Sequence, residues 1–273
     1  MTRLFSLSHL TVLDFTPPDL IRLAADAGFD AVGIRLAPAT VSEPIYDVTK
    51  DARLRAATLA ALNDTGLRVL DVEILRLVPA FSARDCEALL AVAQMLGARH
   101  VLVAGNDPDA ARAAEHLAEL AAFAGAFDLT IDLEPMPWTD VPDVATAGRI
   151  VEGAGAANAG VLVDALHFDR AGSTVADLAA IPAARCHYMQ LCDAPAERPA
   201  SIEAMLHTAR AERLPPGEGG LDLRAILRAL PPEIPVSLEI PQVDKASTTA
   251  AIDRVRHDLA LARAVVAAAD GGP

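Results

Sequence analysis

The 273-residue sequence has few aromatic residues and contains no long apolar run. Phe, Trp and Tyr make up 4% of the chain, whereas apolar residues make up 52%. That apolar content is enough for a full core and disfavours disorder, and the abundant alanine favours helices packed closely on a sheet. No run of about 18 apolar residues predicts a membrane span. The N-terminus also lacks the basic and apolar regions of a signal peptide.

Cysteine and positive charge are also scarce. The chain has three cysteines, Cys86, Cys186 and Cys192, without a CxxC pair or zinc-finger spacing. This disfavours disulfides and a structural zinc site, and it favours a cytoplasmic location. Lys and Arg number 23 against 37 Asp and Glu, which gives a net charge of −14 with no basic cluster. We therefore expect no nucleic-acid partner and no membrane-surface partner.

Short β-like runs alternate with amphipathic helical stretches along the chain. Helix signals mark several boundaries, such as Thr16-Pro17-Pro18 at a start and Gly28 at an end. Eight strands are expected at residues 4–9, 31–36, 68–74, 100–104, 129–134, 160–164, 187–192 and 235–240. Helices are expected at 16–27, 51–64, 83–96, 108–123, 141–153, 175–180, 221–230 and 248–268, with an extra helix at 200–210.

A helix after each of eight strands predicts parallel strands joined by right-handed crossovers. The runs 101–103 and 161–163 are continuously apolar, which is typical of strands covered on both faces. A doubly wound open sheet is the competing fold. It usually carries a glycine-rich turn after its first strand, and the sequence has neither GxGxxG nor GxxxxGK[ST]. The sequence therefore predicts an α/β protein, a single (β/α)8 TIM barrel that spans residues 1–273.

Polar residues stand at the ends of four consecutive predicted strands: Glu134, Asp164, Gln190 and Glu239. In such a barrel the C-terminal strand ends converge on one face, which carries the catalytic groups. Three buried carboxylates without a cation would repel one another and raise their pKa values. An oxygen-only donor set suits one Mn²⁺ or Mg²⁺ ion, with Co²⁺ possible, better than zinc or copper.

Five short stretches resemble motifs of the xylose isomerase-like TIM barrel superfamily, often labelled sugar phosphate isomerase/epimerase. The resemblance covers essentially the whole chain and implies one divalent metal held by residues 134, 164, 190 and 239. Many members carry His where Gln190 stands. Gln at this position is similar to what is found in the 3-dehydroshikimate dehydratase branch of the superfamily. The stretches are Leu133-Glu134-Pro135, Asp164-Ala165-Leu166-His167, Gln190-Leu191-Cys192-Asp193, Gly217-Glu218-Gly219 and Leu238-Glu239-Ile240.

The resemblance implies an enzyme of carbohydrate metabolism. Glu134 and Glu239 would move a proton next to a carbonyl, while the metal stabilises the enediolate. His167 would act as an acid or base, or orient a substrate oxygen. The leading hypothesis is a metal-dependent isomerase or epimerase of a small keto-sugar or cyclic polyol. The alternatives are a lyase of the 3-dehydroshikimate dehydratase type and a metal-free barrel that serves as a binding module.

Four residues are candidates for substrate binding: Arg76, Trp138, Arg170 and Arg198. An arginine can bind a carboxylate through two hydrogen bonds, and a tryptophan can stack on a ring. Solvated arginines and loop packing of Trp138 are the alternatives. No glycine-rich nest or basic pair follows strands seven and eight, so we do not expect a phosphorylated substrate. A homo-oligomer is compatible with this barrel class. Arg35, after the second strand, is a weaker candidate of the same kind as Arg76. His9 and Glu73 are expected near the rim in an ion pair or hydrogen bond.

Overall fold

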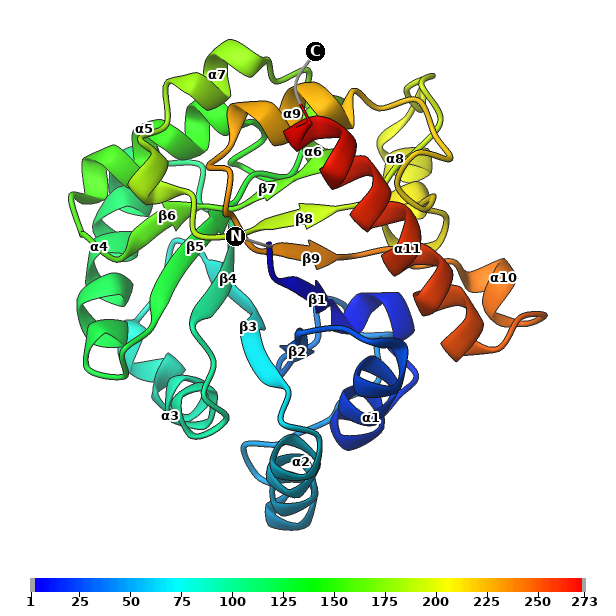
Figure 1. Ribbon diagram of the computed structural model, residues 1–273. Helices are drawn as coiled ribbons and strands as arrows, with labels where there is room; N and C mark the ends of the chain where they lie inside the picture. The colour runs from blue at the N-terminus through cyan, green and yellow to red at the C-terminus, as the bar shows by residue number, and fades with distance from the viewer. Residues whose placement is uncertain (1–2, 272–273) are drawn as a thin grey trace.

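Parallel strands form the centre of the computed structural model, which describes residues 3–271, and helices surround them (Figure 1). All strand pairs are parallel, in the order β6-β5-β4-β3-β2-β1-β9-β8-β7. The strands are β1 (Phe5–Leu7), β2 (Ala31–Arg35), β3 (Arg68–Leu77), β4 (His100–Gly105), β5 (Thr130–Glu134), β6 (Ala159–Val161), β7 (Val163–Asp164), β8 (Met189–Leu191) and β9 (Val236–Leu238).

The sheet closes through an interrupted sixth strand. β6 pairs with β5, and β7 pairs with β8. Leu162 separates the two halves, and its N–H donates to the Leu133 carbonyl at 3.0 Å. The predicted continuous strand at 160–164 is therefore two short strands in line. The prediction of a TIM barrel is confirmed, with a single strand at seven of the eight expected places and the pair β6 and β7 at the eighth.

Helices follow the strands and form the outer ring. Local signals explain many ends: Pro17 and Pro18 open the first helix, and Gly28 closes it with a left-handed φ of 90°. The α-helices are α1 (Pro17–Ala27), α2 (Ala52–Thr65), α3 (Glu87–Met95), α4 (Ala110–Gly125), α5 (Val144–Ala154), α6 (Ala165–Arg170), α7 (Val175–Ala179), α8 (Ile202–Ala211), α9 (Leu223–Ala229), α10 (Val243–Ala246) and α11 (Ala251–Asp270). Short 3₁₀ helices are η1 (His9–Val12), η2 (Ala83–Cys86) and η3 (Ala183–Arg185).

Four short helices, η1, α6, η3 and α10, were not predicted. α6 begins directly where β7 ends, because the Asp164 side chain accepts a hydrogen bond from the His167 N–H and caps the helix. A six-residue helix is too short to show a helical period in the sequence. The third strand also runs three residues beyond its predicted end, to Leu77. Within residues 3–271, no helix is long and apolar enough to cross a membrane.

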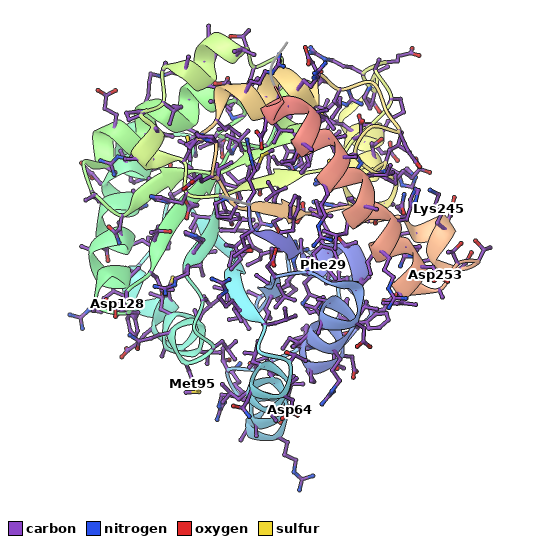
Figure 2. All side chains as sticks on the ribbon, viewed as in Figure 1. Phe29, Asp64, Met95, Asp128, Lys245 and Asp253 are labelled. Carbon is purple, nitrogen blue, oxygen red and sulfur yellow. The ribbon has the colours of Figure 1, made fainter. Side chains whose placement is uncertain are left out.

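Alternation along the strands separates two layers of core. On β5, Ile131 and Leu133 pack in the large core between the sheet and the helices. Leu102 and Leu162 belong to a smaller core inside the barrel. Side chains alternate sides along a strand, so Glu134 faces the barrel interior. Figure 2 shows Phe29 inside the molecule and Asp64, Met95 and Asp128 at its edge.

Candidate metal and active site

The C-terminal end of the barrel interior is lined by polar side chains, all of them buried. All but Glu73, which lies within β3, stand at or next to the end of a strand, and all face inward. They include all four residues that the sequence predicted as metal ligands on neighbouring strands. The set is Ser8, Arg35, Glu73, Glu134, Asp164, Gln190 and Glu239.

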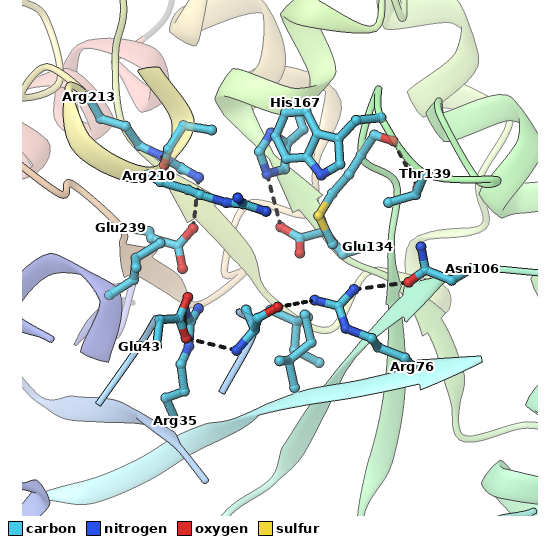
Figure 3. Close-up of a pocket in the computed structure, with 17 residues that line it drawn as sticks. Arg35, Glu43, Arg76, Asn106, Glu134, Thr139, His167, Arg210, Arg213 and Glu239 are labelled. Carbon is cyan, nitrogen blue, oxygen red and sulfur yellow. Dashed lines mark hydrogen bonds and ion pairs between the residues drawn. The ribbon is translucent and has the colours of Figure 1, made fainter. Parts of the chain in front are cut away.

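Glu134, Asp164 and His167 form one close group in this cluster. One ligand atom from each lies within 4.8 Å of the others. His167 Nε2 is 3.7 Å from Glu134 Oε1 (Figure 3), and His167 Nδ1 is 3.9 Å from Asp164 Oδ1. Among the described residues, Glu134 Oε1 and Gln190 Oε1 are buried without a hydrogen-bond partner. Buried oxygens of this kind are normally satisfied, so they point to a missing proton donor or cation.

Glu239 lies on the other side of a buried arginine. Arg213 Nη1 contacts Asp164 Oδ2 at 2.5 Å, and its Nη2 contacts Glu239 Oε2 at 2.9 Å. The other Glu239 oxygen accepts from Gln190 Nε2 and from Ser8 Oγ, each at 3.0 Å. The structure therefore brings all four predicted ligands to one place. It also adds a guanidinium between two of them.

Burial and repulsion set the charge of this cluster. Burial raises the pKa of Glu134 well above its ordinary value, and the Glu239 and Asp164 carboxylates raise it further. Burial also raises the pKa of Glu239 to about 7, although Arg213 opposes the shift. Burial disfavours ionisation of Asp164, but the charge and hydrogen bond of Arg213 and the contacts of His167 together outweigh this effect and lower the pKa of that carboxyl. Burial lowers the pKa of His167 to about 4, so this imidazole is neutral.

The donor set fits a divalent cation. Its atoms are oxygens of carboxylates and an amide, two of which have no partner. A cation beside Glu134 would offset the burial and the repulsion that raise the pKa of this side chain. Arg213 supplies one positive charge to the cluster, which leaves negative charge for a metal to balance.

A cavity of about 120 Å³ opens beside Glu134 and Glu239. Arg76 borders it, donating to Asn106 Oδ1 at 2.9 Å and to the Ala39 carbonyl at 3.0 Å (Figure 3). Burial lowers the pKa of Arg76, and the nearby Arg210 lowers it further. The other residues along the wall are Leu10, Arg35, Ala39, Glu43, Ile74, Leu102, Met136, Trp138, Thr139, His167, Ala209 and Arg213.

The predicted substrate-binding residues divide into two groups. Arg76 and Trp138 line the cavity, and Trp138 packs edge-on against His167 with ring centroids 4.9 Å apart. Arg170 and Arg198 do not line it. Arg170 contacts Asp169 at 2.6 Å, and the half-exposed Arg198 lies 3.4 Å from the same carboxylate. The structure thus gives both arginines a local ion pair in place of a cavity position.

The expected rim residues do form buried contacts. Arg35 Nη2 lies 2.5 Å from Glu73 Oε2 and Arg35 Nη1 lies 3.2 Å from Glu43 Oε1. His9 Nδ1 accepts from the Arg35 N–H, so its Nε2 donates to the Phe15 carbonyl. These contacts hold the loop after β2 against the mouth of the cavity.

Sequence reasoning missed Arg210, Arg213, Glu43 and Asn106. Arg213 reaches the cluster because Asp193 and Leu214 form an antiparallel bridge. Asp193 also accepts from the Gly217 and Leu221 N–H groups, which fastens the predicted G-x-G turn. A Cβ on Gly219 would lie 2.2 Å from Asp193 Oδ1, so the turn needs glycine there. The turn motif was visible in the sequence, but nothing local showed that it would bring in Arg213.

A closed parallel barrel with a buried acidic centre at the C-terminal strand ends defines the class of this protein. The chain belongs to the xylose isomerase-like TIM barrel family, whose model matches residues 21–265. The family recognised from the sequence motifs is thereby confirmed. No curated protein sequence matches the chain.

Several solved structures share the fold. A xylose isomerase-like TIM barrel/4-hydroxyphenylpyruvate dioxygenase fusion protein is 22% identical with a TM-score of 0.77 over 95% of this chain, which spans 42% of that protein. An IolI protein with a bound zinc atom is 20% identical with a TM-score of 0.76, covering 97% of this chain and 98% of the other. D-allulose 3-epimerase from Methylomonas sp., in complex with D-allulose, is 18% identical with a TM-score of 0.71, covering 96% and 97%.

Proposed function

We propose that the protein is a divalent-metal-dependent isomerase or epimerase of a small keto-sugar or cyclic polyol. The observation that carries the proposal is that Glu134 and Glu239 are both buried and line one small cavity. Two carboxylates at one cavity can remove a proton and return it. The family of the chain and the D-allulose bound to a structural relative support a sugar substrate.

Glu134, Asp164, Gln190 and Glu239 would hold one Mn²⁺ or Mg²⁺ ion, with Co²⁺ as a further candidate. When bound, such an ion polarises the carbonyl and hydroxyl oxygens of a substrate and makes the adjacent C–H bond more acidic. The unpartnered oxygens of Glu134 and Gln190 support this ligand set.

The chain's own residues would then move one proton. One glutamate carboxylate takes the proton from the carbon beside the carbonyl, and the electron pair of the broken C–H bond forms an enediolate. A glutamic acid returns a proton to the same carbon from the other side, or to its neighbour. His167, neutral and held by Trp138, would orient a substrate hydroxyl. Arg213 would help to stabilise the negative charge that develops on oxygen.

Metal content is the first test. We expect about one Mn²⁺ or Mg²⁺ per chain after reconstitution, with loss of the ion in Asp164→Asn and Glu239→Gln. Glu203→Gln removes an exposed carboxylate on α8 and should retain the metal. If the wild type takes up no metal at this site while all proteins are folded, the enzyme proposal fails, and a barrel that serves as a binding module becomes the better description.

Proton exchange is the second test. Incubation with a panel of keto-sugars and keto-inositols in deuterated water should place deuterium on the carbon next to the carbonyl. Glu134→Gln and Glu239→Gln should each lower kcat by about 10²–10⁴-fold, the usual contribution of a general acid or base. The absence of exchange across the whole panel, with metal bound, would count against an isomerase.

A specific observation also supports a dehydratase. Arg76 and Arg210 both line the cavity, and neither has a carboxylate partner among residues 3–271. Two neighbouring arginines that form no ion pair with a carboxylate favour an anionic substrate, which a keto acid such as 3-dehydroshikimate would provide. The same proton removal followed by loss of water would give a dihydroxybenzoate. Formation of this aromatic product from dehydroshikimate, with KM raised in Arg76→Met, would favour the dehydratase over the epimerase.

A further inference from the structure

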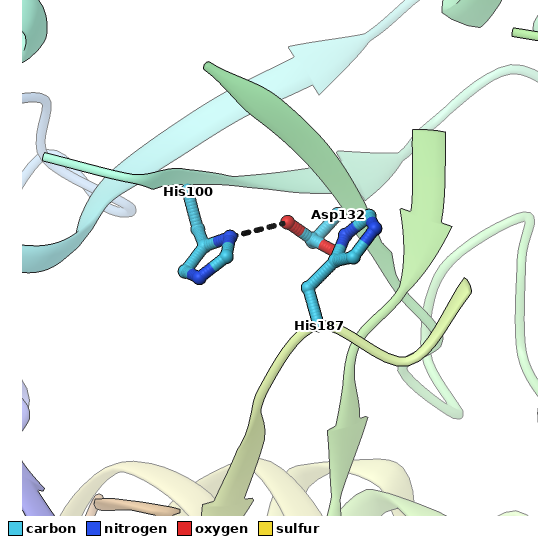
Figure 4. A group of neighbouring side chains, drawn as sticks. All are labelled: His100, Asp132 and His187. Atoms are coloured by element: carbon cyan, nitrogen blue, oxygen red, sulfur yellow. Dashed lines mark hydrogen bonds and ion pairs between the residues drawn. The ribbon is translucent and has the colours of Figure 1, made fainter. Parts of the chain in front are cut away.

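A second cluster of ligand-type side chains lies deeper in the barrel, below the cavity. His100 is the first residue of β4, Asp132 is the middle residue of β5, and His187 precedes β8 (Figure 4). One ligand atom from each lies within 4.8 Å of the others. Asp132 stands two residues before Glu134, which places it about 7 Å further from the C-terminal strand ends. None of the three lines the cavity of the proposed active site.

Hydrogen bonds hold both imidazoles against the Asp132 carboxylate. His187 Nδ1 lies 2.6 Å from Asp132 Oδ1, and the backbone of Ala184 also hydrogen-bonds this ring. Thr130 Oγ1 donates to Asp132 Oδ2 at 2.8 Å and lies 2.7 Å from His100 Nδ1. His100 Nδ1 is 3.6 Å from the same Asp132 oxygen. A backbone contact on the ring and a hydroxyl on the carboxylate are the supports that metal-ligating residues usually have.

The two imidazoles of this cluster are partly open to solvent. Asp132 is fully buried, whereas the side chains of His100 and His187 are 13% and 16% exposed. Gly160 faces the cluster, and a Cβ there would lie 2.7 Å from both Asp132 Oδ1 and the His187 ring. The close approach of the ring and the carboxylate therefore depends on glycine at this position.

We propose that His100, Asp132 and His187 bind one zinc ion, or a similar divalent transition-metal ion, near the N-terminal end of the barrel. Two imidazoles and one carboxylate are a zinc-type donor set, with the fourth position open to water. The oxygen-only cluster above is a different donor set and would select a different metal. An ion here joins β4, β5 and the segment before β8, so its role is to fasten the base of the barrel.

The test uses the full chain with the upper cluster disabled by Glu134→Gln and Glu239→Gln, so its outcome does not depend on the proposed activity. In this background we expect one Zn²⁺ per chain after equilibrium dialysis. Co²⁺ in its place should give the visible absorption bands of a four-coordinate site with nitrogen ligands. Adding His187→Gln should abolish both signals, whereas adding His207→Gln, which changes an exposed histidine on α8, should preserve them.

Thr130→Val keeps all three ligands and removes only the supporting hydroxyl. It should weaken Zn²⁺ binding by about 10–100-fold, as loss of such a partner does elsewhere. Thermal unfolding with and without Zn²⁺ then shows whether each variant is folded and whether the ion stabilises it. Equal Zn²⁺ uptake with and without His187→Gln, or no uptake by the folded background protein, would overturn the proposal and leave a proton shared between His187 and Asp132.

Discussion

At the scale of single residues, Arg213 sets the charge balance of the acidic centre. Its side chain is fully buried and contacts both Asp164 and Glu239. Burying an arginine costs solvation energy, which only close carboxylates can offset. The same contacts hold the two carboxylates in place before any metal or substrate arrives.

Arg213→Met should therefore destabilise the metal-free protein. Removing one partner from a buried ion pair typically costs about 3–5 kcal/mol, because the carboxylates lose their counter-charge. Denaturant unfolding of the metal-free variant and the wild type measures the difference. Addition of Mn²⁺ should recover part of the loss, since a cation replaces some of the missing positive charge. Unchanged stability would show that Arg213 contributes little to the balance.

Glu134 gives the opposite prediction. Its buried carboxyl group has an oxygen without a partner, and burial raises the pKa of this group well above its ordinary value. Glu134→Gln replaces this ionisable group with a neutral amide. The metal-free variant should therefore be at least as stable as the wild type, with a gain of up to about 1 kcal/mol. With saturating Mn²⁺ the order should reverse, because only the wild type gains from the ion. Thermal unfolding of both proteins in EDTA and in Mn²⁺ tests this, and an order that does not reverse contradicts it.

At the scale of elements, α11 carries a buried charge on its packed side. Val255, Leu259 and Ala262 are buried on this helix, and Asp258 is buried among them. Among the described residues, neither Asp258 oxygen has a hydrogen-bond partner. Burial raises the pKa of Asp258 to about 7, although the nearby cations oppose the shift. The helix thus contains an acid that is protonated when folded at mildly acidic pH.

This pKa predicts a pH dependence of stability. The folded pKa lies above the unfolded value of 3.8, so the folded state holds a proton that the unfolded state releases. Stability should fall as pH rises from about 4 to about 7, by up to about 4 kcal/mol from this group. Asp258→Asn should remove that slope and leave other pH effects unchanged. The variant keeps the charged neighbours of Asp258, which are His257, Arg254, Lys245 and Glu218. If stability still falls with pH in the variant, these neighbours cause the pH dependence.

At the scale of the whole molecule, the acidic centre joins residues from widely separated parts of the chain. Glu134, Asp164, Gln190 and Glu239 come from β5, β7, β8 and the end of β9. A metal bound to all four exists only in the folded barrel, so its binding free energy adds to folding stability. At a metal concentration of 100 times Kd the gain is about 2.7 kcal/mol.

Saturating Mn²⁺ should accordingly raise Tm by several degrees, since about 1 kcal/mol shifts Tm by about 2–4 °C in a domain of this size. EDTA should reverse the shift, and Asp164→Asn should show none. Scanning calorimetry at several Mn²⁺ concentrations measures both effects. A Tm that does not depend on metal in the wild type would contradict a metal held jointly by these strands.

Local patterns in the sequence determined the strand and helix order and the inward direction of the four strand-end ligands, because strand alternation and helix caps act over a few residues. Only the tertiary structure decided which distant side chains meet them. Arg213 and Asp164 are 49 residues apart, and His187 and Asp132 are 55 apart. Arg170 and Arg198 form ion pairs with Asp169 and do not line the cavity. Such pairings depend on how loops pack over the barrel, and no short-range periodicity encodes that packing.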